Sequence, residues 1–587
     1  MVEFGVANTL SGLGNEVSLI GCKGMFLPQC IATNEARLAF SPEVNSSVKS
    51  VCVSCQNRST LLRNHFSLVD QLSIEDFKNS GDEKIVDNFL ASISRDDFLE
   101  KKYEGMPVCR IAMYEFALKY KLRSTNFEHE YWAEYLHQLR NVLFTALGFK
   151  RALAEIKPDR VVVLNSLYSL NQIACNVAET TGIPSYSIGA SQNFSHRQKS
   201  FSLFRSPQDW IALSRSNSWH EYSKNRKYPI DIKACDDHFK NIMSGKNPFT
   251  YSQGISDKDK DDVRSFFGIL ESQKICVATL SSEDEYFAAE LIGVVPDFSS
   301  GTAFVANQYE WLSLLIEFFS KNLDLALIIR VHPREFPNKR DSVTAESVEK
   351  LKQLFNNLPS NVRVNWPDDG ISIYALADKT DLLLNWRSTV GVEFLALGIP
   401  VLVPSCSNLL SYPIELNHLG ESALEYEKLI LQLLNENWSM TNVYNAYAWM
   451  TFLSNFAALH IDSTERAPQK LTLLRPTAPG LSLRIWEKLV SNFLTYAPLL
   501  LEKRSIKGWS LPTEVASIIQ ETLAREASSL AETILAQGFE VTVEIDMDDC
   551  VKDLTESLLR RVSLIESSSS SSYILKRMNS SAGRIVP

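Results

Sequence analysis

The sequence of 587 residues has no run of about 18 consecutive apolar residues, so no membrane-spanning helix is expected. Its first residues have neither the basic start nor the long apolar core of a secretory signal peptide. Ten cysteines in a chain of this length do not suggest a disulfide scaffold. We therefore expect a protein of the cytoplasm.

Positive charge is also scarce: the formal net charge is −10 at pH 7, and no stripe of lysine and arginine is visible. The absence of such a stripe argues against a nucleic-acid partner. An acidic balance does not exclude an anionic ligand, because helix ends and single arginines bind phosphate locally. With 45% hydrophobic and 22% charged residues, the composition is that of an ordinary globular protein, and the length indicates two or more domains.

Strand-like and helix-like segments alternate on both sides of a polar stretch, residues 237–260, that looks like an interdomain linker. Such alternation predicts an α/β protein with two Rossmann-like parallel-sheet domains, followed by a helical C-terminal extension. The last residues follow a run of six serines and have little to bury, so we expect disorder there. The predicted boundaries are 1–250 for the N-terminal domain with a helical insertion at 68–150, 251–435 for the C-terminal domain, 436–565 for the helical region and 566–587 for the tail.

The N-terminal domain begins unusually, because residues 4–13 form a helix-like segment and no strand-like segment precedes them. A doubly wound domain normally opens with a strand. Either the sheet lacks this strand or the natural chain starts farther upstream, and we favour the second explanation.

A first chemistry-bearing segment follows the apolar run Leu325–Val331, which predicts a buried strand. Pro333 ends this strand, and His332 before it would point into a cleft at the strand ends, where ligands of parallel sheets bind. There the imidazole could donate to a phosphate, although a histidine that only caps the loop fits the pattern equally well. Arg330 and Arg334 flank it and are candidates for the same phosphate or for salt bridges.

A second segment follows the apolar run at 381–384. Ser388 and Thr389 stand at the start of a helix that Gly398 ends. Hydroxyl and N–H groups at a helix start bind phosphate oxygens, and Arg387 could add a charge-assisted contact. The alternative is an ordinary helix cap, which serine and threonine provide routinely.

Glu393 lies about one turn into this helix, among apolar neighbours. Its carboxylate could accept hydrogen bonds from a ribose diol while the helix start holds the phosphate. A glutamate that merely faces solvent is the alternative. The order of the segments, with His332-Pro333 first and then Ser388, Thr389 and Glu393, favours a nucleotide-sugar site.

The segments Arg330–Glu335 and Arg387–Val401 resemble the nucleotide-sugar half of GT-B glycosyltransferases, in particular the capsule and lipopolysaccharide synthesis group that includes the Kdo-transferring capsule enzymes. Residues 281–285 and 307–311 are similar too, so the resemblance covers residues 270–415 well and the N-terminal half weakly. In that family a His-Pro pair and hydroxyl residues at the helix start hold the nucleotide phosphate, and a helix glutamate holds the ribose. The matching residues are His332, Pro333, Ser388, Thr389 and Glu393.

The resemblance implies transfer of a sugar from a nucleotide-sugar donor, CMP- or UDP-linked, to a glycan or lipid-linked glycan acceptor in surface polysaccharide synthesis. The C-terminal domain would bind the donor and the N-terminal domain the acceptor, with Asn165 at a strand end on the acceptor side. His332 and one of the three arginines would stabilise the leaving phosphate, and Asp284 is the candidate base. No catalytic metal is expected, and peripheral docking on the inner membrane is consistent with such a function.

Other functions of the same fold stay open at this stage. A sugar-nucleotide epimerase would need acidic catalytic residues in the cleft, and a polyol-phosphate transferase of the teichoic-acid type also uses a His-Pro segment. A protein of another class, an inactive scaffold of GT-B fold in an export complex, would bind no nucleotide.

Four cysteines form a separate candidate site, with the spacing C-x7-C for Cys22 and Cys30 and C-x2-C for Cys52 and Cys55. Four thiolates that include one tight pair can bind structural zinc tetrahedrally. The first spacing is unusual for a zinc ribbon, so four ordinary cysteines in a reducing compartment are the alternative.

Overall fold

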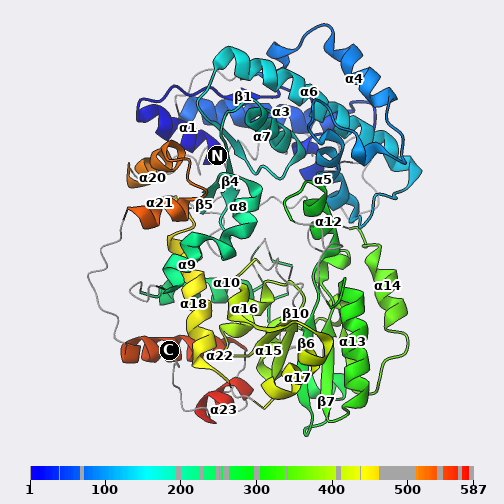
Figure 1. Cartoon of the computed structure of the whole chain (residues 1–587), viewed down its shortest axis with the longest axis vertical. Coiled ribbons are helices and arrows are strands. Elements are labelled where there is room, and N and C mark those ends of the chain that lie inside the picture. The colour runs from blue at the N-terminus through cyan, green and yellow to red at the C-terminus, as the bar shows by residue number, and fades with distance from the viewer. Residues whose placement is uncertain are drawn as a thin grey trace, which may run out of the picture.

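The computed structural model shows two α/β units stacked along the long axis of the molecule, the N-terminal unit above the C-terminal unit in Figure 1. No helix in the described part of the chain is long and apolar enough to cross a membrane. The structure describes the chain except for residues 1, 37, 39, 67–71, 193–199, 225–228, 246, 248–249, 252, 256–262, 296–303, 339–341, 405–410, 436–437, 462–510, 512, 538–546, 566–571 and 581–587.

The C-terminal unit is built on a six-stranded parallel sheet with the strand order β11-β10-β9-β6-β7-β8. Its central strands are buried over their whole length, which explains why they appear in the sequence as unbroken apolar runs. Strand β6 pairs with β7 on one side and with β9 on the other, so the strand order reverses there and a crevice opens at the strand ends. The strands are β6 (Lys274–Thr279), β7 (Leu325–Arg330), β8 (Val362–Asn365), β9 (Leu382–Asn385), β10 (Val401–Pro404) and β11 (His418–Gly420).

Helices connect these strands and cover the sheet, as a chain of parallel strands requires. The polar residues at the carboxyl ends of β6, β7 and β9 consequently come together at one edge of the sheet. The helices are α11 (Val263–Phe267), α12 (Glu283–Leu291), α13 (Gln308–Lys321), α14 (Ser347–Leu354), α15 (Ile373–Lys379), α16 (Val390–Leu395) and α17 (Ala423–Leu433), and a short 3-10 turn spans Pro333–Glu335.

The sheet of the N-terminal unit has four strands in the order β12-β5-β4-β3. Only β3 (Val161–Leu164) and β4 (Ser185–Ala190) pair in parallel, whereas β5 (Ser200–Phe204) and β12 (Leu459–His460) add antiparallel pairings. Strand β3 lies at the sheet edge, and the side chain of Leu164 is accordingly exposed. No described residue occupies the place of the opening strand that a doubly wound sheet would have beyond β3.

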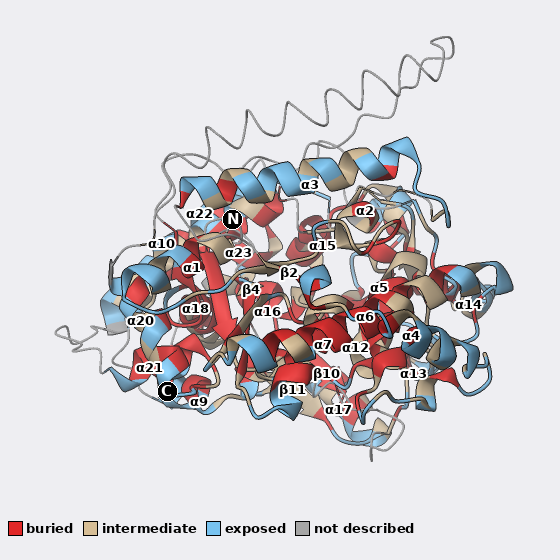
Figure 2. Cartoon of the chain, turned by 90° about the horizontal axis from the view of Figure 1, so that it is seen from above, coloured by how far each residue is buried: buried red, intermediate tan, exposed pale blue. Residues whose placement is uncertain are grey.

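Around this sheet the N-terminal unit is mainly helical, in agreement with the helical segment expected from the composition. Helices α6 and α7 carry many buried residues, whereas α3 runs along one side of the unit, at the upper edge of Figure 2, and has few buried residues. A separate parallel pair joins β1 (Ile20–Gly21) to β2 (Leu72–Ser73). The helices are α1 (Val2–Gly12), α2 (Ile31–Glu35), α3 (Ser46–His65), α4 (Asp82–Ala91), α5 (Val108–Tyr120), α6 (Trp132–Ile156), α7 (Ser169–Thr180), α8 (Pro207–Ile211), α9 (Asn217–Lys224) and α10 (Ile232–Met243).

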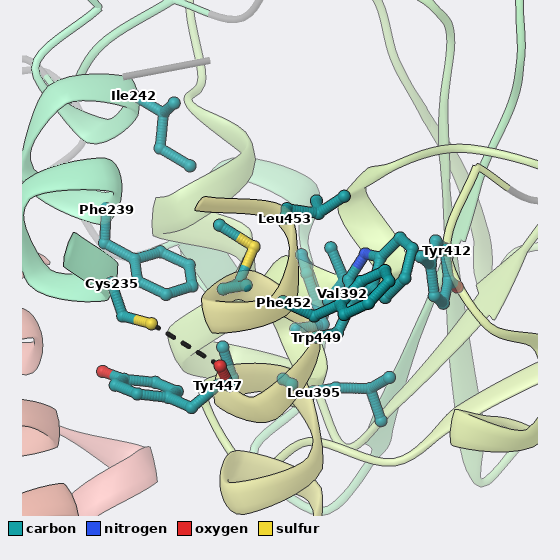
Figure 3. Packing of buried hydrophobic residues seen from close by; sticks show 14 of the residues in the cluster. Cys235, Phe239, Ile242, Val392, Leu395, Tyr412, Tyr447, Trp449, Phe452 and Leu453 are labelled. Carbon is teal, nitrogen blue, oxygen red and sulfur yellow. Dashed lines mark hydrogen bonds between the residues drawn. The ribbon is translucent and has the colours of Figure 1, made fainter. Parts of the chain in front are cut away.

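Helix α18 (Met440–Asn455) lies between the two units and contacts α9 and α10 on one side and α16 on the other. Its side chains interlock with theirs in one buried cluster (Figure 3). The thiol of Cys235 in α10 donates to the carbonyl of Tyr447 in α18 over 3.7 Å, shown as the dashed line. Directly after α18 the chain enters strand β12, which belongs to the sheet of the N-terminal unit.

The remaining helices divide between the two units (Figure 1). α20 (Thr513–Ala524) packs on α1, and α21 (Leu530–Ala536) on α9 and β5. α22 (Met547–Ile565) packs on α10, α15 and α18, and α23 (Tyr573–Ser580) on α15. The α/β class with Rossmann-like units and a helical C-terminal region is thus confirmed.

The expectation of a disordered tail over residues 566–587 is wrong for its middle part. Ile574 and Leu575 in α23 are buried, and the hydroxyl of Ser572 donates to Asp378 over 2.7 Å. Arg577 pairs with Asp381 over 2.7 Å. A short amphipathic segment therefore finds enough apolar surface on α15 to order, which composition alone does not reveal. Residues 566–571 and 581–587 lie outside the described part.

Candidate functional site

A cavity of about 440 Å³ lies between the two units at the carboxyl ends of β6, β7 and β9, and we call it the central cavity. The wall formed by the C-terminal unit carries many polar side chains. The opposite wall, formed by α8, α10 and α18, is largely apolar. Residues on the polar wall include Ser281, Ser282, Glu285, Arg330, His332, Pro333, Arg387, Ser388, Thr389 and Glu393. Residues on the opposite wall include Trp210, Ile211, His238, Trp449, Met450 and Leu453.

His332 follows β7 and lines the central cavity, as the sequence predicted for a strand-end residue. The backbone N–H of Arg334 donates to its Nδ1 over 3.2 Å, so Nδ1 accepts and cannot carry a proton. Burial and the nearby cations lower the pKa of His332 to about 4, which keeps the ring neutral at physiological pH. In the neutral ring Nε2 carries the proton, so His332 offers an N–H donor.

Arg334 and Asp284 form a buried ion pair rather than part of the cavity lining. The Arg334 Nε and Nη2 atoms donate to Asp284 Oδ2 over 2.9 and 2.6 Å, and its Nη1 donates to the Tyr251 hydroxyl over 2.8 Å. The predictions of Arg334 as a phosphate ligand and of Asp284 as the base do not match these positions. The physical reason is that each side chain is held by the other, away from the cavity surface.

The segment Arg387-Ser388-Thr389 lines the central cavity at the end of β9. It is held by the buried Asn385, whose Oδ1 accepts from the N–H of Ser388 over 3.2 Å and whose Nδ2 donates to the carbonyl of Ser388 over 2.8 Å. Arg387 has a left-handed φ of 60°, and its guanidinium lies 4.8 Å from the ring centre of Tyr286. The loop therefore presents a cation and two hydroxyls from a fixed backbone.

Gly391, in the first turn of α16, makes the tight packing behind this loop possible. A Cβ at this position would lie 1.8 Å from the Tyr412 hydroxyl and 2.6 Å from Asn385 Nδ2. The Tyr412 hydroxyl itself accepts from Asn385 Nδ2 over 3.0 Å. Asn385, Gly391 and Tyr412 were not predicted as residues of the site. The glycine inside a short helix could have pointed to this packing. Glycine lowers the stability of a helix by about 1 kcal/mol relative to alanine, so it commonly occurs where another part of the chain packs closely against the helix.

Glu393 is buried in α16, with 6% of its surface exposed, and lines the central cavity. The Tyr374 hydroxyl donates to its carboxylate over 3.0 Å. Burial raises the pKa of Glu393 to about 7. The alternative of a solvent-facing helix glutamate is thus excluded.

Arg330, the last residue of β7, also reaches the central cavity, although it is mostly buried. Its Nη1 donates to the carbonyl of Ile371 over 3.0 Å and to the Asn365 side chain. These contacts tie Arg330 to the floor of the cavity, so it contributes mainly positive potential to the site.

Asn165, predicted on the acceptor side, does not line the central cavity. It directly follows β3 and has a left-handed φ of 47°, a conformation that asparagine tolerates. Its Oδ1 accepts from the N–H of Leu167 over 3.3 Å, which closes a local turn. The N-terminal unit instead contributes residues that include Gln192, Trp210, Ile211 and His238 to the cavity lining. No motif in the neighbouring sequence indicated that these residues belong to a site.

The structure brings the four cysteines of the proposed zinc site toward one another. Burial raises the pKa of the Cys22, Cys52 and Cys55 thiols, and the proximity of the other cysteines raises it further, to about 11 for Cys55. The N–H of Gly24 donates to Cys22 Sγ over 3.5 Å. No group of three or more histidine, cysteine or acidic side chains in the described residues is arranged to hold a metal ion. The zinc site stays a prediction.

Comparison with known proteins gives no matching family description and no matching curated protein. Similar solved structures include a putative UDP-N-acetylglucosamine 2-epimerase from Listeria monocytogenes (15% identity, 58% of this chain and 88% of that chain, TM-score 0.23). Another is UDP-GlcNAc 2-epimerase from Methanocaldococcus jannaschii in complex with UDP-GlcNAc and UDP (16% identity, 58% of this chain and 94% of that chain, TM-score 0.24). A third is the glycosyltransferase SnogD from Streptomyces nogalater (11% identity, 62% of this chain and 81% of that chain, TM-score 0.22). The α/β fold class follows from the protein's own strand order, with two α/β units around one cavity.

Proposed function

We propose that the protein is a glycosyltransferase that moves a sugar from a CMP- or UDP-linked donor to a glycan or lipid-linked glycan acceptor in capsule or other surface polysaccharide synthesis. The observation that supports this proposal is the convergence, in one cavity, of a neutral imidazole donor, an arginine, two hydroxyls and a buried carboxylate. These are groups that hold a phosphate at one end and a sugar diol at the other.

The phosphate end of the site is formed by His332, Arg387, Ser388 and Thr389. When the bond between the sugar and the phosphate breaks, negative charge develops on the phosphate oxygen. A preorganised N–H donor and a guanidinium aimed at this oxygen lower the barrier, because they need no reorganisation as the charge appears. His332 serves this purpose without carrying a charge itself.

The ribose end is formed by Glu393, with Tyr374 behind it. An ionised carboxylate accepts both hydrogens of a cis-diol, and Tyr374 fixes the orientation of the carboxylate. The apolar residues of α18 lie next to α16 and provide a dry surface for the rest of the nucleotide. The C-terminal unit thus binds the donor, and the acceptor approaches from the side of α8 and α10.

Incubation of the purified chain with CMP-, UDP-, GDP- and TDP-sugars, with and without glycan acceptors, tests this proposal. Release of free nucleotide that requires an acceptor is the expected result. Epimerised sugar nucleotide without transfer would instead identify an epimerase, and transfer of a phosphorylated polyol would identify a polyol-phosphate transferase. Failure to bind any nucleotide would identify a scaffold and overturn the proposal.

A further inference from the structure

Among the described residues that line the central cavity, two carry carboxylates, Glu285 and Glu393. Glu393 is buried and oriented by Tyr374 for the ribose end. Glu285 lies in the first turn of α12, and 49% of its side chain is exposed. Its neighbour Asp284 has only 2% of its side chain exposed. Of the adjacent acidic residues after β6, Glu285 is therefore the one that a bound ligand can reach.

Contacts at both carboxylate oxygens hold Glu285 in place. The Ser282 hydroxyl donates to its Oε2 over 2.6 Å, and the guanidinium of Arg334 lies 3.5 Å from its Oε1. A hydroxyl donor and a nearby cation both favour the ionised carboxylate. Glu285 is also close enough to His332 for its charge to act on the imidazole. The carboxylate is thus anchored and lies near the group that faces the leaving phosphate.

His332 cannot itself take up a proton at Nε2, because this nitrogen already carries one while Nδ1 accepts from Arg334. The two roles of a transferase site, support of the leaving group and removal of a proton, consequently fall on different residues. We propose, on the basis of the transferase function above, that Glu285 is the general base that deprotonates the acceptor hydroxyl.

The proposed step conserves atoms and charge. The acceptor hydroxyl gives its proton to the Glu285 carboxylate, which becomes a carboxylic acid, and the acceptor oxygen forms the new bond to the anomeric carbon. The bond between that carbon and the phosphate oxygen breaks, and its electron pair leaves with the nucleotide. The Nε2–H of His332 donates a hydrogen bond to the departing oxygen.

The Glu285→Gln variant removes the proton acceptor and keeps the shape and the contact with Ser282. Acceptor-dependent nucleotide release should fall at least 100-fold, because positioned general bases contribute about 10²- to 10⁴-fold. Nucleotide affinity, measured by calorimetry, should stay that of the wild type. The acidic limb of the pH–kcat profile should disappear, and Glu285→Asp should restore part of the rate. Glu317→Gln, an exposed carboxylate on α13, is the matched control and should behave as wild type.

Four results would count against this role. Near-wild-type turnover in Glu285→Gln would overturn it while leaving the transferase function intact. An equal loss of nucleotide affinity, or a lowered melting temperature with an unchanged pH profile, would show a structural partner of Arg334 instead of a base. Absence of acceptor-dependent release in the wild type would overturn the proposed function, and the role of Glu285 with it.

Discussion

The hydroxyl of Tyr374 donates to the carboxylate of Glu393 over 3.0 Å inside the wall of the central cavity. The pair comes from two helices, α15 and α16, that sit on either side of strand β9 in the sequence. Burial raises the pKa of Glu393 to about 7, so its charge changes within the physiological range. Ligand binding at this site should therefore depend on pH.

Nucleotide affinity should rise as pH increases through about 7, because only the ionised Glu393 accepts both hydrogens of the ribose diol. Below that pH the protonated carboxyl loses one acceptor position. The Glu393→Gln variant should bind about ten- to a hundredfold more weakly at pH 8, since hydrogen bonds to a charged group contribute about 1.5–3 kcal/mol. Calorimetric titrations between pH 6 and 8 measure this effect. The phosphate of the nucleotide titrates identically in experiments with either protein. The difference in pH dependence between the wild type and Glu393→Gln therefore gives the contribution of Glu393.

His332→Ala should lower acceptor-dependent turnover by at least 100-fold, because it removes a preorganised donor to the leaving phosphate. Since the pKa of His332 is lowered to about 4, the wild-type rate should show no inflection near pH 6.5 from this residue. His220→Ala, an exposed histidine on α9, is the control. A His332→Ala rate equal to that of the control would remove His332 from the site.

Gly391→Ala should weaken nucleotide binding and destabilise the fold by about 1–3 kcal/mol, the usual cost of overpacking a filled interior. The added methyl group would overlap the Tyr412 hydroxyl. To remove this overlap, α16 would have to shift, and the loop that carries Ser388 would be displaced with it. Gly81→Ala is the matched control, because nothing lies within 4 Å of a Cβ there. Urea unfolding and nucleotide titration of both variants measure the difference. Equal behaviour of the two variants would show that the packing behind α16 is loose.

Asp284→Asn should destabilise the protein by about 3–5 kcal/mol, because it leaves the buried Arg334 guanidinium with the more distant, half-exposed Glu285 carboxylate as its counter-charge. A double replacement, Asp284→Leu with Arg334→Met, should be less harmful than Asp284→Asn alone, since it removes both charges. Urea unfolding gives both values. If Asp284→Asn were as stable as the wild type and inactive, Asp284 would be the base after all.

Zinc analysis of the purified full chain tests the cysteine cluster. If Cys22, Cys30, Cys52 and Cys55 bind structural zinc, the wild type should hold near-stoichiometric metal, and Cys22→Ser/Cys55→Ser should lose both the metal and some thermal stability. Cys276→Ser, at a buried cysteine of β6 remote from the cluster, controls for loss of a thiol as such and should keep the metal. Metal-free wild-type protein of full stability would end the zinc hypothesis.

Local sequence signals were sufficient to predict much of the C-terminal unit. The run Leu325–Val331 is apolar because a central parallel strand is buried on both faces, and Pro333 ends it for steric reasons. Ser388 and Thr389 were predicted at the strand end because their neighbours form a strand, a turn and a helix in succession. These features depend on residues within about ten positions of one another.

Features that depend on distant pairs could not be predicted in this way. Asp284 was taken as a base because it follows a strand, yet Arg334, fifty positions away, holds it in a buried pair. The partnership of Gly391 with Tyr412 depends on packing between a helix and a remote loop. The opposite wall of the cavity is formed by α8, α10 and α18. Helix α18 lies about 200 residues after the other two in the sequence, so no local pattern predicts that they line the same cavity.

The return of the chain through α18 into strand β12 has a consequence for how the protein can be divided. The sheet of the N-terminal unit takes its last strand from residues 459–460, and α20 and α21 pack on that same unit. A cut near residue 250, the predicted domain boundary, would therefore give two fragments that are each incomplete, the first without the edge strand β12 and the second with that strand but without the sheet it pairs with. The two units are interleaved in the chain, so the sheet of the N-terminal unit receives its last strand only after the whole six-stranded sheet of the C-terminal unit has been synthesised.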